Sequence, residues 1–223
     1  MNKTKSKCMI FRKSIGNNPV REIRLKEDKF EVVTKYKYLG HFVHECLTDD
    51  DDVKFRLNNF YSKFNSIFRN FNNVSIETFL FLFNAYCLPD YGLCLWNAKA
   101  IFNRQIFRSF ETAFSNALKK VIGAPVYASS HITAELCHQL LFRHYVSFIQ
   151  ARFLKRVLLR KNEINILCYS YLKDGHICKS LFGLFKDVYN CNICDNDMDV
   201  LRARLEWVQK NENRRGVCHF YGI

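Results

Sequence analysis

The apolar residues of this chain change their spacing at Asp52. Before it, the short β-branched and aromatic runs "CMIF", "VREIRL", "KFEVV" and "YKYLGHFV" are separated by turn-forming segments. After it, apolar residues recur every three or four positions, as on one face of a helix: Val53, Leu57, Phe60, Phe64, Ile67, Phe68 and Phe71. The sequence therefore predicts an α+β fold, predominantly α, in which a short antiparallel β meander precedes a helical bundle.

Further helices are predicted downstream. Ser75 is a candidate N-cap for a helix that runs to about Tyr86 and ends before Pro89. A later stripe is followed by the stop signals Gly123 and Pro125; it consists of Phe102, Ile106, Phe110, Ala113, Phe114, Ala117 and Val121. Ser129 or Ser130 opens a short helix, and residues 142–161 continue as a long basic amphipathic helix. We expect nearly all of the phenylalanines in these stripes, including Phe60, Phe64, Phe68 and Phe71, to form core.

The composition favours an intracellular protein with a polyanionic partner. The 223 residues are 48% hydrophobic and carry a formal charge of +13, which suits nucleic acid but also a ribosomal surface, a membrane surface or a basic scaffold. We find no secretion signal, and the longest apolar stretch, "FLFLFNAYCLPDYGLCLW", is interrupted by polar residues and proline. We therefore expect no membrane span, a nuclear or cytoplasmic location, and ten mostly buried, reduced cysteines.

Five short motifs occur in a fixed order. The first is N-x-x-K-S-x-x-M, with Asn2, Lys5, Ser6 and Met9, and the last is "ALKKVIGAPVYASSH". Between them lie three more: K-Y-L-G-H at Lys37, Tyr38, Leu39, Gly40 and His41; D-V-x-x-R at Asp52, Val53 and Arg56; and a spaced set at Leu82, Phe83, Tyr86, Cys87, Tyr91, Gly92, Leu95 and Trp96. Together they resemble the end of the palm and the thumb of reverse transcriptases from non-LTR, LINE-type retrotransposons. Each motif alone is weak, but five in family order over residues 1–160 are hard to reach by chance.

This resemblance implies three regions. Residues 1–45 would be residual palm and primer-grip strands, residues 46–165 a helical thumb, and residues 166–223 a C-terminal extension of uncertain fold. The implied partner is an RNA–DNA or DNA primer–template duplex, together with an upstream palm and fingers region. The implied parent function is RNA-directed DNA synthesis, to which this chain would contribute primer–template binding.

The catalytic aspartates of the resembled family are missing from this sequence. Polymerases of this kind use paired carboxylates to hold two divalent ions, here Mg²⁺ in the complete parent enzyme. No [FY]-x-D-D sequence is present, so we expect those carboxylates to precede Met1 in a truncated or mis-started reading frame. Lys5 matches the motif lysine that lies near the nucleotide site. We expect no cofactor in this chain and no polymerase activity from it alone.

Two groups of residues are candidates for nucleic-acid binding. The segment from Lys37 to His41 matches the primer grip, although it also reads as an ordinary amphipathic strand. Basic residues on the polar helix faces could follow a duplex through its phosphates, or could be ordinary solvated residues. They are Lys54, Arg56, Lys63 and Arg69 in the first helix, followed by Arg104, Arg108, Lys119 and Lys120.

Two polar clusters give weaker signals. We interpret Asp49 to Asp52 as a solvated loop and helix cap, because four adjacent like charges do not converge on a metal ion. Asp52, and with it Asp51, would serve as N-cap and first-turn acids of a helix that begins at Val53. Cys191 and Cys194 form a C-x2-C pair, but the other candidate zinc ligands have no standard spacing; they are His176, Cys178, Cys218 and His219. We expect these cysteines to be unpaired thiols.

Two alternatives to the enzyme-fragment interpretation stay open. The chain could be a retained, non-enzymatic helical protein that binds nucleic acid or protein on its own, or a non-functional retroelement remnant. An in-frame palm with an aspartate pair in the upstream genomic sequence would favour the fragment, whereas a genuine promoter and start codon would favour a stand-alone protein.

Overall fold

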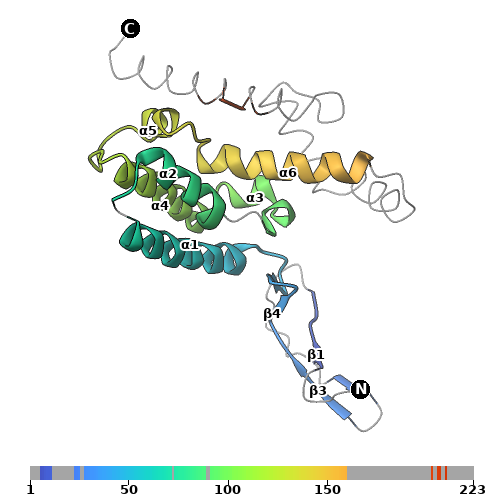
Figure 1. Cartoon of the computed structure of the whole chain (residues 1–223). Helices are drawn as coiled ribbons and strands as arrows, with labels where there is room; N and C mark the ends of the chain where they lie inside the picture. Colours follow the sequence, from blue (N-terminus) through green and yellow to red (C-terminus); the bar gives the residue numbers. More distant parts are fainter. Residues whose placement is uncertain are drawn as a thin grey trace. The chain divides into compact units, whose positions relative to one another are not determined.

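The fold is α+β and predominantly α, as predicted (Figure 1). The computed structural model describes residues 6–11, 23–25, 28–71, 73–88 and 91–159, and four single positions, 202, 205, 206 and 209. It divides into two compact units, Met1–Arg56 and Leu57–Ile223. The division falls inside a helix, at Arg56, whereas the sequence placed a boundary after residue 45. Most of the predicted C-terminal extension, 166–223, lies outside the described residues.

The first unit contains two small sheets. Strands β1 (Lys7–Cys8), β3 (Asp28–Val32) and β2 (Ile23–Leu25) form one sheet in that order, with β2 antiparallel and β1 parallel to β3. Strands β4 (Lys35–Tyr38) and β5 (His41–His44) form a separate antiparallel pair. The prediction of a single antiparallel meander is therefore wrong, because the strands form two sheets and one pair is parallel. Because the short β2–β3 connection makes those two strands a hairpin, β1 occupies the other edge of β3, where it runs parallel to it.

Helix α1 (Asp50–Asn70) begins earlier than predicted, at Asp50 instead of Val53. The Asp49 carbonyl accepts the first helical hydrogen bond, from the Val53 amide at 2.9 Å, so Asp49 lies at the N-cap position. Asp50, Asp51 and Asp52 then form an acidic first turn, which the positive end of the helix dipole stabilises.

The apolar stripe of α1 forms core except at its end. Five of its members are buried: Val53, Leu57, Phe60, Phe64 and Ile67. Phe68 is partly buried, but Phe71 is 44% exposed because α1 ends at Asn70 and the helical spacing stops there. The expectation that Phe71 belongs to the core is therefore wrong.

The second helix of the chain, α2 (Ile76–Leu82), begins at its predicted cap. The Ser75 hydroxyl accepts a hydrogen bond from the Thr78 amide at 3.2 Å, which confirms Ser75 as the N-cap. The helix widens into a π-helical turn, η1 (Phe83–Cys87), and a 3-10 turn, η2 (Leu93–Leu95), and the short α3 (Ala98–Ile101) follow.

Three more helices of the second unit follow within residues 91–159 of the described part, and all three were predicted, although Phe102 of the predicted stripe lies in the turn before the first of them. In α4 (Gln105–Val121), the closing hydrogen bonds run from the Ala124 amide to Lys119 and from the Gly123 amide to Lys120, with Gly123 at φ +68°. This is the Schellman pattern, in which the residue after the helix takes a left-handed conformation that glycine adopts without strain. Helix α5 (Ser130–Leu136) begins after Ser129, and α6 (Phe142–Leu159) is the long helix.

An aromatic core joins the helices of the second unit. Phe60 of α1 lies 6.0 Å from Phe83 of η1 and 5.4 Å from Phe110 of α4, measured between ring centroids. Phe110 in turn stacks on Phe142 of α6 at 4.1 Å. Ring pairs at such distances add about 0.5–1.5 kcal/mol each beyond the area they bury. Helix α4 therefore lies at the centre of this unit, in contact with α2, α5 and α6.

Helix α6 departs from a simple amphipathic pattern. His144, Ser147 and Gln150 are all buried along it, at 2% exposure or less. Buried polar groups need hydrogen-bond partners, so this side of α6 carries specific contacts as well as packing. Within the part of the chain that the structure describes, no helix is both long and apolar enough to cross a membrane.

Candidate nucleic-acid interface

The K-Y-L-G-H motif folds as a tight β-hairpin. Lys35 pairs with His44 and Tyr38 with His41, which leaves Leu39 and Gly40 as a two-residue turn. Leu39 has φ +45° and Gly40 φ +81°, and two consecutive positive φ values are typical of the type I′ turn that matches strand twist. The segment is thus two strands and a turn, and the interpretation of Gly40 as a glycine within a strand is corrected.

Strand β4 is open to solvent along its whole length. Lys35, Tyr36, Lys37 and Tyr38 are all exposed, and the turn residue Leu39 is 71% exposed. A row of alternating basic and aromatic side chains without a covering layer is unusual for a strand that only supports a core. This strand and its turn are therefore the part of the first unit best suited to contact a partner.

The Lys37 ammonium is held against aromatic rings of its own unit. Its Nζ lies 4.1 Å from the ring centroid of Phe55 on α1 and 5.6 Å from that of Phe42 on β5. Such cation–π contacts contribute about 0.5–1 kcal/mol at exposed sites. They restrict the side chain without neutralising it, so the positive charge remains available to an anion.

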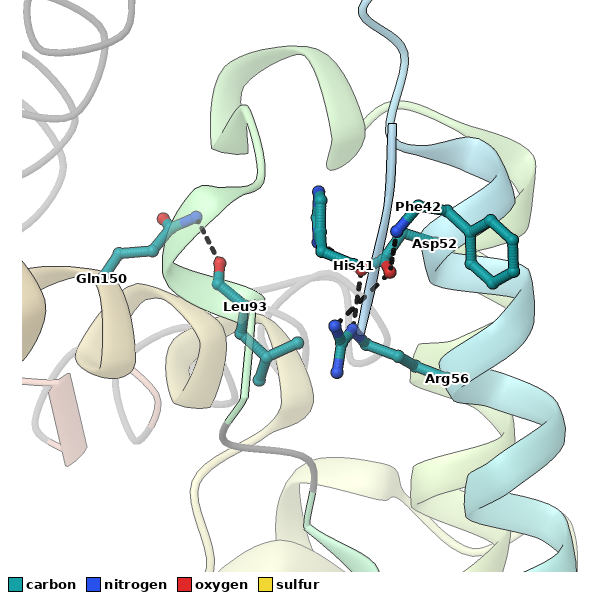
Figure 2. Close-up of polar contacts among 6 residues, drawn as sticks. All are labelled: His41, Phe42, Asp52, Arg56, Leu93 and Gln150. Carbon is teal, nitrogen blue, oxygen red and sulfur yellow. Dashed lines mark hydrogen bonds and ion pairs between the residues drawn. The ribbon is translucent and has the colours of Figure 1, made fainter. Parts of the chain in front are cut away.

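A buried carboxylate connects the hairpin to the first turn of α1 (Figure 2). Asp52 accepts hydrogen bonds from the Phe42 amide at 3.0 Å and from the Arg56 guanidinium at 2.7 Å for Nε and 3.4 Å for Nη2. The His41 Nδ1 lies 3.1 Å from the same carboxylate, outside hydrogen-bond geometry. Two donor groups, a backbone amide and a guanidinium, thus converge on a single buried acid, and an imidazole ring lies beside it.

The prediction that Asp52 is a solvated cap is wrong. Asp52 has no exposed surface and Arg56 is only 6% exposed. Because α1 begins at Asp50, Asp52 lies one helical turn before Arg56 and on the side that meets the hairpin. The other three aspartates of the run, Asp49, Asp50 and Asp51, are partly exposed, and the Asp51 carboxylate lies 3.3 Å from Lys35 Nζ.

Some of the predicted basic residues are exposed and others are buried. Five are exposed, as the duplex hypothesis requires: Lys54, Lys63, Arg69, Arg104 and Arg108. Lys120 is also exposed, with its Nζ 4.1 Å from the Phe68 ring centroid. Arg56 and Lys119 are buried, since Arg56 binds Asp52 and Lys119 donates to the Val126 carbonyl at 2.7 Å. These two side chains therefore do not lie on open helix faces, and that expectation is corrected for them.

Several candidates fall outside the described residues. They are Lys5, the pair Cys191 and Cys194, and the possible zinc ligands His176, Cys178, Cys218 and His219. Among the residues that the structure does describe, no three His, Cys, Asp or Glu side chains are grouped so as to hold a metal ion.

The described cysteines Cys8, Cys46, Cys87, Cys94 and Cys137 are not joined in disulfides. Burial raises the pKa of Cys87 to about 11, against a small opposing effect of Lys63, and it also raises the pKa of Cys137. The thiolate is the nucleophilic form of cysteine. A raised pKa therefore makes both side chains structural rather than reactive.

Two buried polar anchors were missed by sequence reasoning. The Asp52–Arg56 pair had a visible signal, the i,i+4 spacing of an acid and an arginine at the start of a helix. Gln150 had none: its Nε2 donates to the Leu93 carbonyl at 3.2 Å (Figure 2) and to the Trp96 carbonyl at 2.9 Å, both more than 50 residues earlier in the chain. This amide holds η2 against α6.

The fold and the hairpin together define a basic α+β protein with an exposed aromatic and basic strand. Comparison with models of known protein families, with curated proteins and with solved structures gives no match for this chain.

Proposed function

We propose that this chain is the primer-grip and thumb part of a non-LTR retrotransposon reverse transcriptase, and that it binds a primer–template duplex through the phosphate backbone. The observation that carries the proposal is the exposed β4 strand with its type I′ turn, formed by the residues that resemble the primer grip. In this role Lys37, Tyr38, Leu39, Gly40 and His41 contact the primer.

The chemistry of the hairpin suits a sugar–phosphate backbone. The Lys37 ammonium is exposed and can pair with a phosphate, and the Tyr38 hydroxyl, on a side chain that is 62% exposed, can donate to a phosphate or sugar oxygen. Such contacts position a duplex without reading its sequence. Gly40 has no side chain, so a backbone can approach the turn closely.

Rigidity of the hairpin supports the same role. A two-stranded hairpin alone is marginally stable in water. Here the Phe42 amide is held by Asp52, and the Phe42 ring lies 5.2 Å from that of Phe55 in an edge-to-face contact. The strand that would meet the primer is therefore fixed to the first turns of α1.

Exposed basic residues of α1 supply further phosphate contacts in this proposal. Lys54, Lys63 and Arg69 are exposed and lie off the apolar stripe. Each phosphate contact releases counterions, so binding that depends on them weakens as salt rises. Nucleotidyl transfer and Mg²⁺ binding belong to the aspartate pair of the parent enzyme, which this sequence lacks.

The test is binding of the full chain to a fluorescent RNA–DNA hybrid, measured by anisotropy over a range of salt concentrations. We expect the logarithm of the association constant to fall linearly with the logarithm of salt. Lys37→Gln or Lys63→Gln should each remove one phosphate contact. Each variant should therefore reduce the slope of that line by about 0.7–0.9. The matched control is Lys29→Gln, which changes an exposed lysine of β3, outside the β4–β5 hairpin.

Binding that does not respond to salt, or that is equal for the wild type and both variants, would contradict the proposal. Equal affinity for the hybrid and for single-stranded RNA would favour a general nucleic-acid-binding protein instead. A primer-extension assay with Mg²⁺ and deoxynucleotides should show no incorporation by this chain alone.

A further inference from the structure

Helices α4, α5 and α6 of the second unit line an open pocket of about 540 Å³. Its lining includes Glu111, Ser115 and Asn116 of α4, and Lys119 near the end of the same helix. His131 of α5 and Arg143 of α6 also line it, and the other polar lining residues are Thr112, Ser130 and His144. Pockets of about 300–1,000 Å³ are the usual size of small-molecule sites.

Lys119 gives the pocket a positive charge that is not paired with any acid of the described residues. The residue is 7% exposed, and its one protein partner in the described part of the chain is the Val126 carbonyl, at 2.7 Å. An ammonium has three N–H donors, so this contact leaves two of them without a protein acceptor. Burial of such a cation costs free energy unless an anion or water accepts from it.

The other charged residues of the pocket cancel each other. The Arg143 guanidinium donates to both oxygens of the Glu111 carboxylate, at 3.0 and 3.4 Å. Its Nη2 also donates to the Phe102 carbonyl at 3.4 Å, which fixes the side chain. Glu111 is thus neutralised by its own partner, and the remaining charge in the pocket is that of Lys119.

Other polar side chains line the same pocket. The His131 Nδ1 is buried and has no hydrogen-bond partner in the described part of the chain. A buried ring nitrogen without a partner is costly, and in the Nδ1–H tautomer it is a donor. The Ser115 hydroxyl and the Asn116 amide, on the same helix as Lys119, add donors with short side chains.

We propose that this pocket binds the phosphate group of a small phosphorylated ligand, of the size of a mononucleotide. A phosphate offers several acceptor oxygens, which can accept from the Lys119 ammonium and from other donors that line the same pocket. Charge-assisted hydrogen bonds of this kind are stronger than neutral ones. The inference concerns the second unit alone and does not depend on duplex binding by the hairpin.

The experiment is calorimetric titration of the full chain with inorganic phosphate, with adenosine 5′-monophosphate and with adenosine. We expect saturable binding of one equivalent of the monophosphate and none of adenosine, because the phosphate supplies the contacts. If inorganic phosphate binds as well as the monophosphate, the site recognises the anion itself; if it binds more weakly, the rest of the ligand also contributes. A chain that binds neither phosphate compound overturns the proposal.

Two pairs of variants locate the binding. Lys119→Met should weaken binding of the monophosphate at least tenfold. Lys120→Met removes the same charge from an exposed neighbour outside the lining, so it should leave the affinity for the monophosphate unchanged. Should Lys119→Met fail to fold, Asn116→Asp places a negative charge at an exposed position of the lining, and Asn103→Asp is its control outside the pocket. Equal affinity in Asn116→Asp and Asn103→Asp would refute this location.

Discussion

The Phe42 amide donates to the carboxylate of Asp52 at 3.0 Å, which links the second strand of the hairpin to the first turn of α1. The same carboxylate binds Arg56, so one buried acid serves a strand and a helix together. A buried ion pair adds little net stability, but removal of one partner leaves the other charge buried and unpaired. Asp52 is therefore a place where a small change should have a large effect.

Asp52→Asn should destabilise the first unit by about 3 kcal/mol, because the Arg56 guanidinium stays buried without its counter-ion. The measurement is amide hydrogen exchange at Phe42, which should become roughly a hundredfold faster for that loss of free energy. Asp51→Asn is the matched control, since its contact with Lys35 is partly exposed and should contribute at most about 1 kcal/mol. Similar exchange rates in the two variants would argue against a buried anchor at Asp52.

Leu39→Asn should stabilise the hairpin by about 1 kcal/mol. Leu39 has φ +45°, a left-handed conformation that costs branched residues about 1–2 kcal/mol and that asparagine adopts more readily. Its side chain is 71% exposed, so the substitution loses little packing. Thermal unfolding and exchange at β4 and β5 amides measure the gain. A loss of stability would mean that the Leu39 side chain is covered in solution.

Gln150→Leu should destabilise the second unit by about 1–3 kcal/mol for each buried carbonyl that loses its donor. The two carbonyls are those of Leu93 and Trp96. Denaturant unfolding measures the change, and Gln105→Leu, at the exposed start of α4, is the control. A Gln150→Leu protein as stable as the control would show that water replaces the amide.

Cys87 should make the stability of the second unit depend on pH above 9. Burial raises the pKa of this thiol from 9.0 to about 11, so the unfolded chain loses the proton before the folded one. The contribution of the protonated Cys87 thiol to the free energy of unfolding is fully present below pH 9 and declines as the pH rises towards 11. Unfolding of the wild type and of Cys87→Ala over this range isolates the effect from that of other groups. Parallel pH profiles would contradict the raised pKa. In the folded wild type, the Cys87 thiol itself, followed by peptide mapping, should also react slowly with iodoacetamide at pH 8.

Local signals predicted the elements of this fold well. The 3.6-residue spacing of Phe60 and Phe64 and the cap at Ser75 depend on neighbours in sequence, and both are confirmed. The α1 start was misplaced because a run of four aspartates looks like a loop, although acids are also favourable within a first turn.

Contacts between distant residues could not be read from local patterns. The burial of Asp52 depends on where the hairpin packs, and the role of Gln150 depends on carbonyls more than 50 residues away. Lys119 looked like one of several basic residues on a helix face, because nothing near it in sequence shows that its ammonium reaches the Val126 carbonyl. Periodicity indicates which side of a helix is apolar, but the partner of a buried polar group comes from tertiary structure.

The position of Trp96 makes it an intrinsic fluorescent probe of the second unit. Its indole is fully buried, its ring centroid lies 6.3 Å from that of Phe107, and its carbonyl is held by Gln150. The chain contains two tryptophans, so a Trp207→Phe protein would emit from Trp96 alone. An indole without water contact emits at shorter wavelength than one in water. A move of the emission to longer wavelength would therefore report loss of the η2–α6 contact, without any added label.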